Sequence, residues 1–154
     1  MSLNPAITIS QATVEDLEEL SRLFDQYRIF YGEKSDVPGA RAFLFDKFVH
    51  LESVIFKAQD EQPGRLVGFT QLYPVYSSIS MRKSWILNDL FVLEEFRRNG
   101  AARMLLKRAA DYAALTGARG IELSTSISNA AAQRLYESLG FIKDEHYFHY
   151  HLTL

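Results

Sequence analysis

The feature that most constrains the fold of this sequence is a helix pattern lying between two strand patterns. The first strand is strongly apolar and runs from Ser84 to Val92, and the second alternates apolar and polar residues from Ile121 to Thr125. Between them, apolar residues recur with the helical period from Ala101 to Ala113, and Gly117 ends that helix. A strand, a helix and a strand in this order predict a right-handed crossover that joins two parallel strands.

The N-terminal half predicts helices followed by antiparallel strands. A strand at residues 6–11 leads into a helix that Thr13 caps and that runs to Gly32, and a second helix covers residues 38–51. Apolar runs at 54–58 and 66–73, separated by the polar residues 60–64, then predict a hairpin whose second arm ends at Pro74.

The C-terminal part predicts a short helix and two last strands. The helix follows Asn129 and ends at Gly140, and the strands cover residues 141–143 and 147–154. The whole order predicts an α/β (α+β) fold with a mixed, mostly antiparallel central sheet and helices on both faces. A length of 154 residues with 47% hydrophobic content suits one domain over residues 1–154.

Composition excludes several classes of function. The chain has no Cys, which rules out a disulfide framework, a thiolate zinc site and a cysteine nucleophile. His50, His146, His149 and His151 do not have the spacing of a metal-binding set, so no metal is expected. A net charge of -2, the lack of a long apolar run and the lack of a secretion signal predict a cytoplasmic protein that binds neither nucleic acid nor membrane.

The turn and helix start at residues 97–102 predict a site for a phosphate group. A glycine flanked by small residues at a helix N-terminus exposes backbone N–H groups to an anion. Residues 94–108 carry five basic and two acidic side chains, a local charge of +3 within a chain of -2, so the remainder carries -5. The segment lacks the glycine patterns of dinucleotide and nucleoside triphosphate sites. The alternative is an ordinary solvated basic face.

The pattern Arg97-x-x-Gly100-x-Ala102 resembles the Gln/Arg-x-x-Gly-x-Gly/Ala signature of the GNAT superfamily of acyl-CoA N-acyltransferases. The segment from Asn129 to Phe141 is similar to the second half of that signature, and residues 87–92 resemble the diamine/polyamine and histone/polyamine acetyltransferase branch. Asn88 is a departure, because polyamine acetyltransferases similar to this chain have a carboxylate there, and an amide is not a base.

The resemblance implies that acetyl-CoA is the cosubstrate. Its pantetheine arm would lie along a strand edge that is splayed from residues 121–125, and a backbone N–H near Val92 would stabilise the tetrahedral oxyanion. The residues implied in binding acetyl-CoA are Leu90, Phe91, Val92, Arg97, Arg98, Asn99, Gly100, Ala101, Ala102, Arg103 and Asn129.

Three residues are predicted to be catalytic. Asp89 and Glu122 are the carboxylates nearest the cofactor strands in the sequence, and either could remove a proton from the amine, directly or through water. The alternative for both is a polar strand residue paired with a cation. Tyr136 matches the tyrosine that protonates the CoA thiolate in many family members, although its helical stripe also suits a core residue.

The predicted function is transfer of an acetyl group from acetyl-CoA to a primary amine, expected to be a small cationic molecule. The alternative within the same class is another acyl-CoA, or another acceptor such as a protein N-terminus, a lysine or an aminoglycoside. The alternative outside it is a CoA-binding sensor without turnover. A homodimer through residues 147–154 is expected by analogy with the family.

Overall fold

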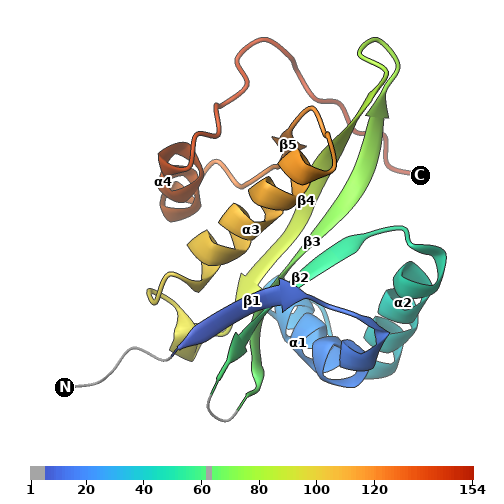
Figure 1. Cartoon of the computed structure of the whole chain (residues 1–154), viewed down its shortest axis with the longest axis vertical. Helices are drawn as coiled ribbons and strands as arrows, with labels where there is room; N and C mark the ends of the chain where they lie inside the picture. The colour runs from blue at the N-terminus through green and yellow to red at the C-terminus, as the bar shows by residue number, and fades with distance from the viewer. Residues whose placement is uncertain (1–5, 62–63) are drawn as a thin grey trace. The chain divides into compact units, whose positions relative to one another are not determined.

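The computed structural model describes residues 6–61 and 64–154, and Figure 1 traces the chain. Gln62 and Pro63, within the expected turn at 60–64, lie outside the described residues, as do residues 1–5. The contacts divide the chain into two compact units, which meet between Leu123 and Ser124 in the sequence. Each unit is described by itself.

The first unit is built on a five-stranded sheet. Its strands, in spatial order, are β1 (Ile7–Gln11), β2 (Val54–Asp60), β3 (Leu66–Ser77), β4 (Arg82–Val92) and β5 (Ile121–Glu122). The first three pairings are antiparallel and the pairing of β4 with β5 is parallel. The predicted mixed, mostly antiparallel sheet of an α/β fold is therefore confirmed, together with the crossover between its two parallel strands.

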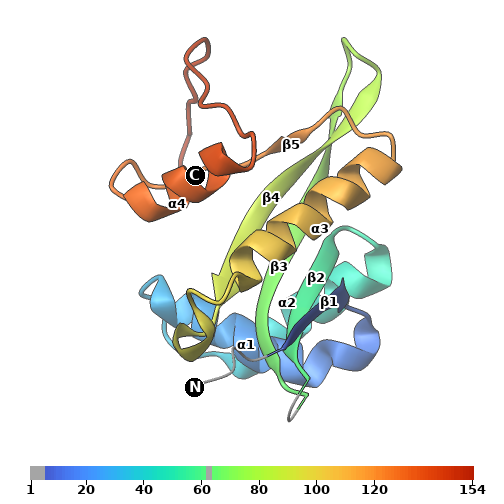
Figure 2. The same ribbon diagram turned by 60° about the vertical axis from the view of Figure 1, so that its left-hand side comes forward.

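Helices cover both faces of this sheet (Figures 1 and 2). Two helices, α1 (Leu17–Phe30) and α2 (Val37–His50), pack against each other on one face, and α3 (Ala101–Leu115) crosses the other. Short 3-10 turns, η1 (Val14–Asp16) and η2 (Glu94–Phe96), precede α1 and α3. The second unit contains α4 (Ala130–Ser138). In the described part of the chain, none of the helices has the length and apolarity needed to cross a bilayer.

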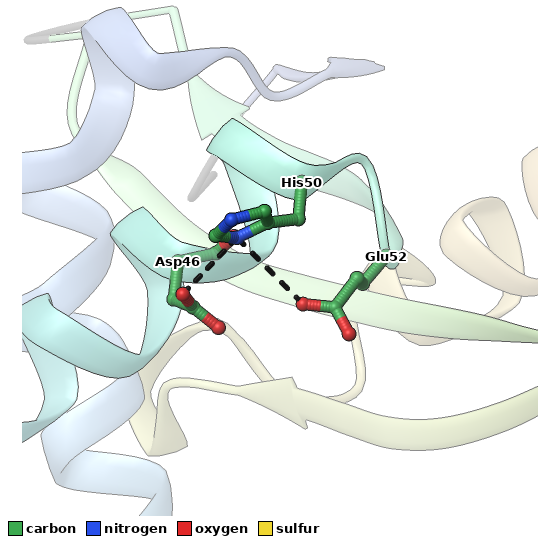
Figure 3. Close-up of side chains that lie close together, drawn as sticks. All are labelled: Asp46, His50 and Glu52. Atoms are coloured by element: carbon green, nitrogen blue, oxygen red, sulfur yellow. Dashed lines mark hydrogen bonds and ion pairs between the residues drawn. The ribbon is translucent and has the colours of Figure 1, made fainter.

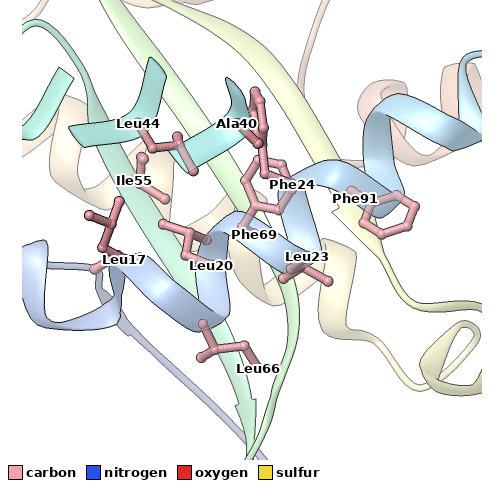
Figure 4. Close-up of a cluster of buried hydrophobic side chains, with 11 residues drawn as sticks. Leu17, Leu20, Leu23, Phe24, Ala40, Leu44, Ile55, Leu66, Phe69 and Phe91 are labelled. Atoms are coloured by element: carbon pink, nitrogen blue, oxygen red, sulfur yellow. The ribbon is translucent and has the colours of Figure 1, made fainter. Parts of the chain in front are cut away.

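The core between α1, α2 and the sheet follows the predicted apolar stripes (Figure 4). Thr13 caps the first turn as expected, because its Oγ1 accepts from Glu15 N at 3.3 Å, and its backbone N–H donates in return to Asp16 Oδ2 at 2.8 Å. The buried cluster draws on α1, α2 and the strands: Ala12, Leu17, Leu20, Leu23, Phe24, Ala40, Leu44, Ile55, Leu66, Phe69 and Phe91. On the opposite face, Leu105 and Ala109 of α3 are fully buried.

The expectation that Pro74 ends a strand is wrong, because β3 continues to Ser77 and pairs Pro74 with Trp85 of β4. Proline lacks an N–H donor, but none is needed at this position. The pairing of β2 with β3 ends at Leu72, and Trp85 directs its own N–H away from β3, to Gly120 O at 3.0 Å.

The predicted strands after Gly120 are mostly wrong. The strand expected at 121–125 contains only Ile121 and Glu122, and residues 141–154 take no regular secondary structure. Alternation of side chains gives a strand preference, but a strand also needs a neighbour to which its backbone can hydrogen-bond. The backbone N–H groups of His146 and Tyr147 donate instead to the Asp144 carboxylate, which makes a local turn.

Candidate active site

A β-bulge in β4 sets the geometry of the candidate site. Gln71 pairs with Asp89 and Leu72 pairs with Leu87, so Asn88 is an extra residue between two ladder positions. An extra residue exchanges the two faces of a strand for all later positions. Accordingly, the ring of Trp85 lies 5.5 Å from that of Tyr112 on α3, whereas the ring of Phe91, an even number of residues later, lies 5.8 Å from that of Tyr27 on α1.

The bulge buries Asp89 on the α1 face and leaves Asn88 exposed. The Asp89 carboxylate accepts hydrogen bonds from Gln71 Nε2 at 2.8 Å, from Asn88 Nδ2 at 3.2 Å and from the Tyr27 hydroxyl. Burial raises the pKa of Asp89, and the three hydrogen bonds oppose that rise only in part. A carboxylate with a raised pKa is a stronger base than an exposed aspartate.

Two tyrosines face this carboxylate from different elements. Tyr27 comes from α1 and Tyr73 from β3, and burial together with the charge of Asp89 raises the pKa of both phenols. Both hydroxyls therefore stay protonated at neutral pH; the Tyr27 hydroxyl donates to Asp89, whereas the Tyr73 hydroxyl is hydrogen-bonded to Gln71. Only the tertiary fold shows that these two aromatic residues lie near a buried acid, because they come from elements far apart in the sequence.

One edge of β4 is open beyond the bulge. The parallel pairing with β5 reaches only Trp85 and Ile86. The N–H of Leu93 donates to Val67 O of β3 at 2.8 Å, so by alternation the N–H groups of Leu90 and Val92 point away from β3, toward the side of β5. These donors lie on the strand edge along which the family resemblance implies that the pantetheine arm of acetyl-CoA binds.

The turn before α3 adopts an unusual backbone conformation. Arg98 and Gly100 have left-handed φ angles of 66° and 79°, and a Cβ added at Gly100 would have no atom within 4 Å. The first helical bond runs from Met104 N to Gly100 O, so the N–H groups of Ala101 and Ala102 have no acceptor within the helix. Those donors and the basic residues around them can hold a phosphate group.

Arg97 is directed toward the α1 face rather than along the turn. Its Nε donates to Val92 O at 2.9 Å, and its guanidinium lies 5.0 Å from the ring centre of Phe30 and 5.7 Å from that of Phe91. It thereby forms part of the wall of an open pocket of about 340 Å³. The lining residues are Gln26, Ile29, Phe30, Phe91, Leu93, Glu94, Glu95 and Arg97.

The remaining predicted site residues lie apart from this group or in the second unit. Glu122 is exposed and pairs with Ile86, before the bulge in β4. Asn129 caps α4, because its Oδ1 accepts from Ala132 N at 3.1 Å. The ring of Tyr136 lies 5.8 Å from that of Phe141. The first unit thus brings together Asp89, the edge at Leu90–Val92 and the turn at 97–103.

A surface cluster at the end of α2 involves the first of the four histidines (Figure 3). His50 Nδ1 lies 3.1 Å from Asp46 Oδ1 and 4.0 Å from Glu52 Oε1. Lys47 Nζ contacts the same two carboxylates at 3.4 and 3.3 Å. The cluster is an exposed ion-pair network in which Lys47 already supplies a cation.

Comparisons with known proteins show a family match and similar sequences over most of the chain. The model of the acetyltransferase (GNAT) family matches residues 17–141. An uncharacterized N-acetyltransferase of Bacillus subtilis, YhfO, is 45% identical over 148 residues, which cover 96% of this chain and 98% of the relative. A pig thialysine N-epsilon-acetyltransferase is 30% identical over 129 residues, which cover 82% of this chain and 73% of the relative.

A solved structure extends the comparison to three dimensions. The crystal structure of a probable acetyltransferase superposes with a TM-score of 0.91 at 44% sequence identity, over 96% of this chain and 97% of the other. Both the family match and this similarity span the two compact units described above.

Proposed function

Because this chain belongs to the acetyltransferase (GNAT) family, we propose that it acetylates a small cationic primary amine by direct transfer from acetyl-CoA. The chain is an acetyl-CoA-dependent N-acetyltransferase, and the class of acceptor is the new part of the proposal. The observation that carries it is the buried Asp89 carboxylate, which lies in the bulge of β4 beside the open strand edge.

The acetyl-CoA site that we propose combines the turn before α3 with the edge of β4. Backbone N–H groups at Ala101 and Ala102, with the side chains of Arg98, Asn99 and Arg103, would hold the pyrophosphate. Gly100 has a left-handed φ angle and no atom within 4 Å of the position that a Cβ would occupy, and both features support a close approach of the anion to the backbone. The backbone N–H of Leu90, on the open edge of β4, would bind a pantetheine amide, and Asn129 stays a residue that the family resemblance implies in binding acetyl-CoA.

The catalytic roles follow from the charges that the reaction creates. An alkyl ammonium has a pKa of about 10.4, so a proton must leave before the nitrogen can attack the thioester. Asp89 is the base that we favour over Glu122, because Asp89 is buried and has a raised pKa while Glu122 is exposed. The Val92 N–H would stabilise the oxyanion, and Tyr136 would protonate the departing thiolate.

Charge and aromatic surface support a cationic acceptor. Outside residues 94–108 the chain carries -5, and the buried Asp89 carboxylate lies near the aromatic side chains of Tyr27 and Tyr73. Carboxylates and aromatic faces both attract an ammonium group. The pig relative is named for thialysine, a small molecule that carries an amine. These features favour a small acceptor over the N-terminus or lysine of a protein.

An acceptor screen tests the proposal. The chain is incubated with acetyl-CoA and with diamines, polyamines, amino acids, aminoglycosides, neutral amines and peptides, and the released CoA thiol is measured. We expect turnover with small cationic amines. Acetylation of neutral or peptide acceptors only would contradict the proposed class, and CoA binding without any turnover would favour the sensor alternative.

Three further expectations stay predictions. One is that residues 1–154 act as a single N-acetyltransferase domain, and another is a cytoplasmic location. The last is a homodimer through residues 147–154, where the exposed side chains include Tyr147, Phe148 and Tyr150. Light scattering of the full chain and of a variant with polar substitutions at these positions measures the dimer directly.

A further inference from the structure

A fully buried glutamine lies next to the Asp89 carboxylate. The exposed fraction of Gln71 is 0%, and an amide is stable in that environment only when its polar atoms are hydrogen-bonded. Its Nε2 donates to Asp89 Oδ2 at 2.8 Å, and its Oε1 accepts from Ser53 Oγ at 2.7 Å. An apolar side chain of similar size would fill the same space without this requirement, so the amide points to a role beyond packing.

The two hydrogen bonds fix which end of the amide faces Asp89. Rotating the amide by half a turn would direct Gln71 Oε1 at Asp89 Oδ2 and would set two acceptors against each other. The Ser53 hydroxyl donates to the other end and supports the observed orientation. The result is a directed chain from Ser53 through Gln71 to Asp89, and a donor that meets a carboxylate favours its ionised form.

We propose that Gln71, held by Ser53, is a positioning residue that fixes the Asp89 carboxylate for removal of a proton from the amine. The proposal rests on the role of Asp89 in the proposed function. Because Gln71 occupies Oδ2, the proton goes to Oδ1, whose bond to the exposed Asn88 is longer at 3.2 Å. An N–H bond of the ammonium breaks, an O–H bond forms on Asp89, and the electron pair left on nitrogen attacks the thioester carbon. As the C–N bond forms, the C–S bond breaks, and the departing CoA thiolate gains a proton while the nitrogen loses its second one.

The titratable groups that face Asp89 are Tyr27 from α1 and Tyr73 from β3. The charge of Tyr31 helps to raise the pKa of Tyr27, and the charge of Glu52 helps to raise the pKa of Tyr73. Since the pKa values of Tyr27 and Tyr73 are raised, both stay protonated over the range in which a buried aspartate titrates. A change in the acid limb of a pH profile, measured with one acceptor, therefore reports on Asp89.

The test replaces Gln71 with methionine, which matches its unbranched shape and cannot donate. In Gln71→Met, the acid limb of kcat/KM should move to higher pH and kcat should fall about tenfold or more, with KM for acetyl-CoA unchanged. Ser53→Ala should move the limb less and in the same direction. An equal loss of activity at every pH, with no displacement of the limb, would overturn the proposal and leave Gln71 a purely structural residue.

Thr70 supplies a matched control. It is also fully buried in β3, but its Oγ1 donates to the backbone carbonyl of Asp89 at 2.8 Å instead of to the carboxylate. Thr70→Val removes one buried hydrogen bond between the same two strands. It should lower the melting temperature without moving the acid limb. A displacement in Thr70→Val equal to that in Gln71→Met would contradict a specific role for the amide.

A second measurement separates this proposal from the proposed function. The carboxyl ¹³C signal of Asp89, titrated by NMR, needs no acceptor and no turnover. The midpoint should rise in Gln71→Met and in Ser53→Ala, and an unchanged midpoint in both would overturn the role of Gln71. If Asp89→Asn keeps wild-type kcat, Asp89 is not the base, so its assignment and the Gln71 proposal both fall while the proposed acetyl transfer stands. If Asp89→Asn is inactive while the Gln71→Met limb is unmoved, only the Gln71 proposal falls.

Discussion

At the scale of single residues, the candidate site depends on one buried acid, Asp89. Burial removes water from its carboxylate, which costs free energy when the group is ionised. Three donors surround the Asp89 carboxylate, yet burial dominates and raises its pKa. Natural active sites commonly keep groups whose environment favours reactivity over stability. The sequence showed Asp89 as one of two carboxylates near the cofactor strands, and burial is what distinguishes it from the exposed Glu122.

Replacing Asp89 with asparagine tests how much the buried charge destabilises the folded state. A raised pKa in the folded state means that folding favours the protonated acid. The stabilising contribution is fully present below the unfolded pKa of about 3.9 and is lost as the pH rises through the folded pKa. The melting temperature of Asp89→Asn relative to wild type should therefore be higher at about pH 8 than at about pH 4, the pH near the unfolded pKa. A difference that is the same at both pH values would contradict a raised pKa.

Tyr136 is the residue whose proposed role needs a kinetic test. Tyr136→Phe keeps the ring that lies against Phe141, so a structural tyrosine should lose about 1 kcal/mol of stability and keep its turnover. A tyrosine that protonates the thiolate should lose about 10²-fold in kcat and still bind acetyl-CoA. The rate is measured where chemistry limits turnover. Near-normal kcat in the variant would leave water as the acid.

At the scale of elements, sequence patterns predicted what depends on local periodicity. The stripes of α1 and α3, the cap at Thr13 and the crossover between β4 and β5 are all present. The bulge at Asn88 was not foreseen, because an extra residue leaves no mark in an apolar run. Because of the bulge, Asp89 faces Gln71 and Tyr27. This arrangement depends on the strand register and on tertiary packing, which the sequence of one strand does not show.

The ends of the strands could likewise not be predicted from local sequence patterns. Pro74 lies inside β3 because its position needs no donor, which depends on where β2 ends and where Trp85 directs its N–H. The strand expected at 121–125 ends after Glu122, and this early end is what leaves the β4 edge open beside Leu90 and Val92. The open pocket beside Phe30 was also missed, since its lining comes from segments far apart in the sequence.

The two ends of α3 permit a controlled test of the acetyl-CoA site. Gly100 and Gly117 have similar left-handed φ angles of 79° and 70°, and a Cβ at either meets no atom within 4 Å. An alanine at either position should cost about 1–2 kcal/mol of stability. Only Gly100→Ala should also weaken CoA binding, by about tenfold or more, because its methyl group would separate the pyrophosphate from the backbone. Calorimetry with both variants measures this, and equal affinities would exclude the turn as the phosphate site.

At the scale of the whole molecule, the charge is distributed unevenly along the chain. Residues 94–108 carry +3 and the remaining residues carry -5, although the net charge is only -2. A basic segment suits a cosubstrate that contains phosphate groups, and an acidic remainder suits a cationic acceptor. The two substrates of the proposed reaction would then be attracted by different parts of one protein.

This distribution predicts that salt weakens the reaction with a cationic acceptor but not with a neutral one. Raising the ionic strength from about 0.01 to 0.15 M shortens the Debye length from about 30 to 8 Å and screens attraction to exposed charges. At saturating acetyl-CoA, kcat/KM for a cationic amine should therefore fall while kcat stays constant, because screening acts on encounter and not on the bound state. A neutral amine of similar size is the control and should show no fall. If kcat/KM for the cationic amine is insensitive to salt, the acidic remainder does not attract the acceptor, and recognition depends on short-range contacts at buried groups such as Asp89.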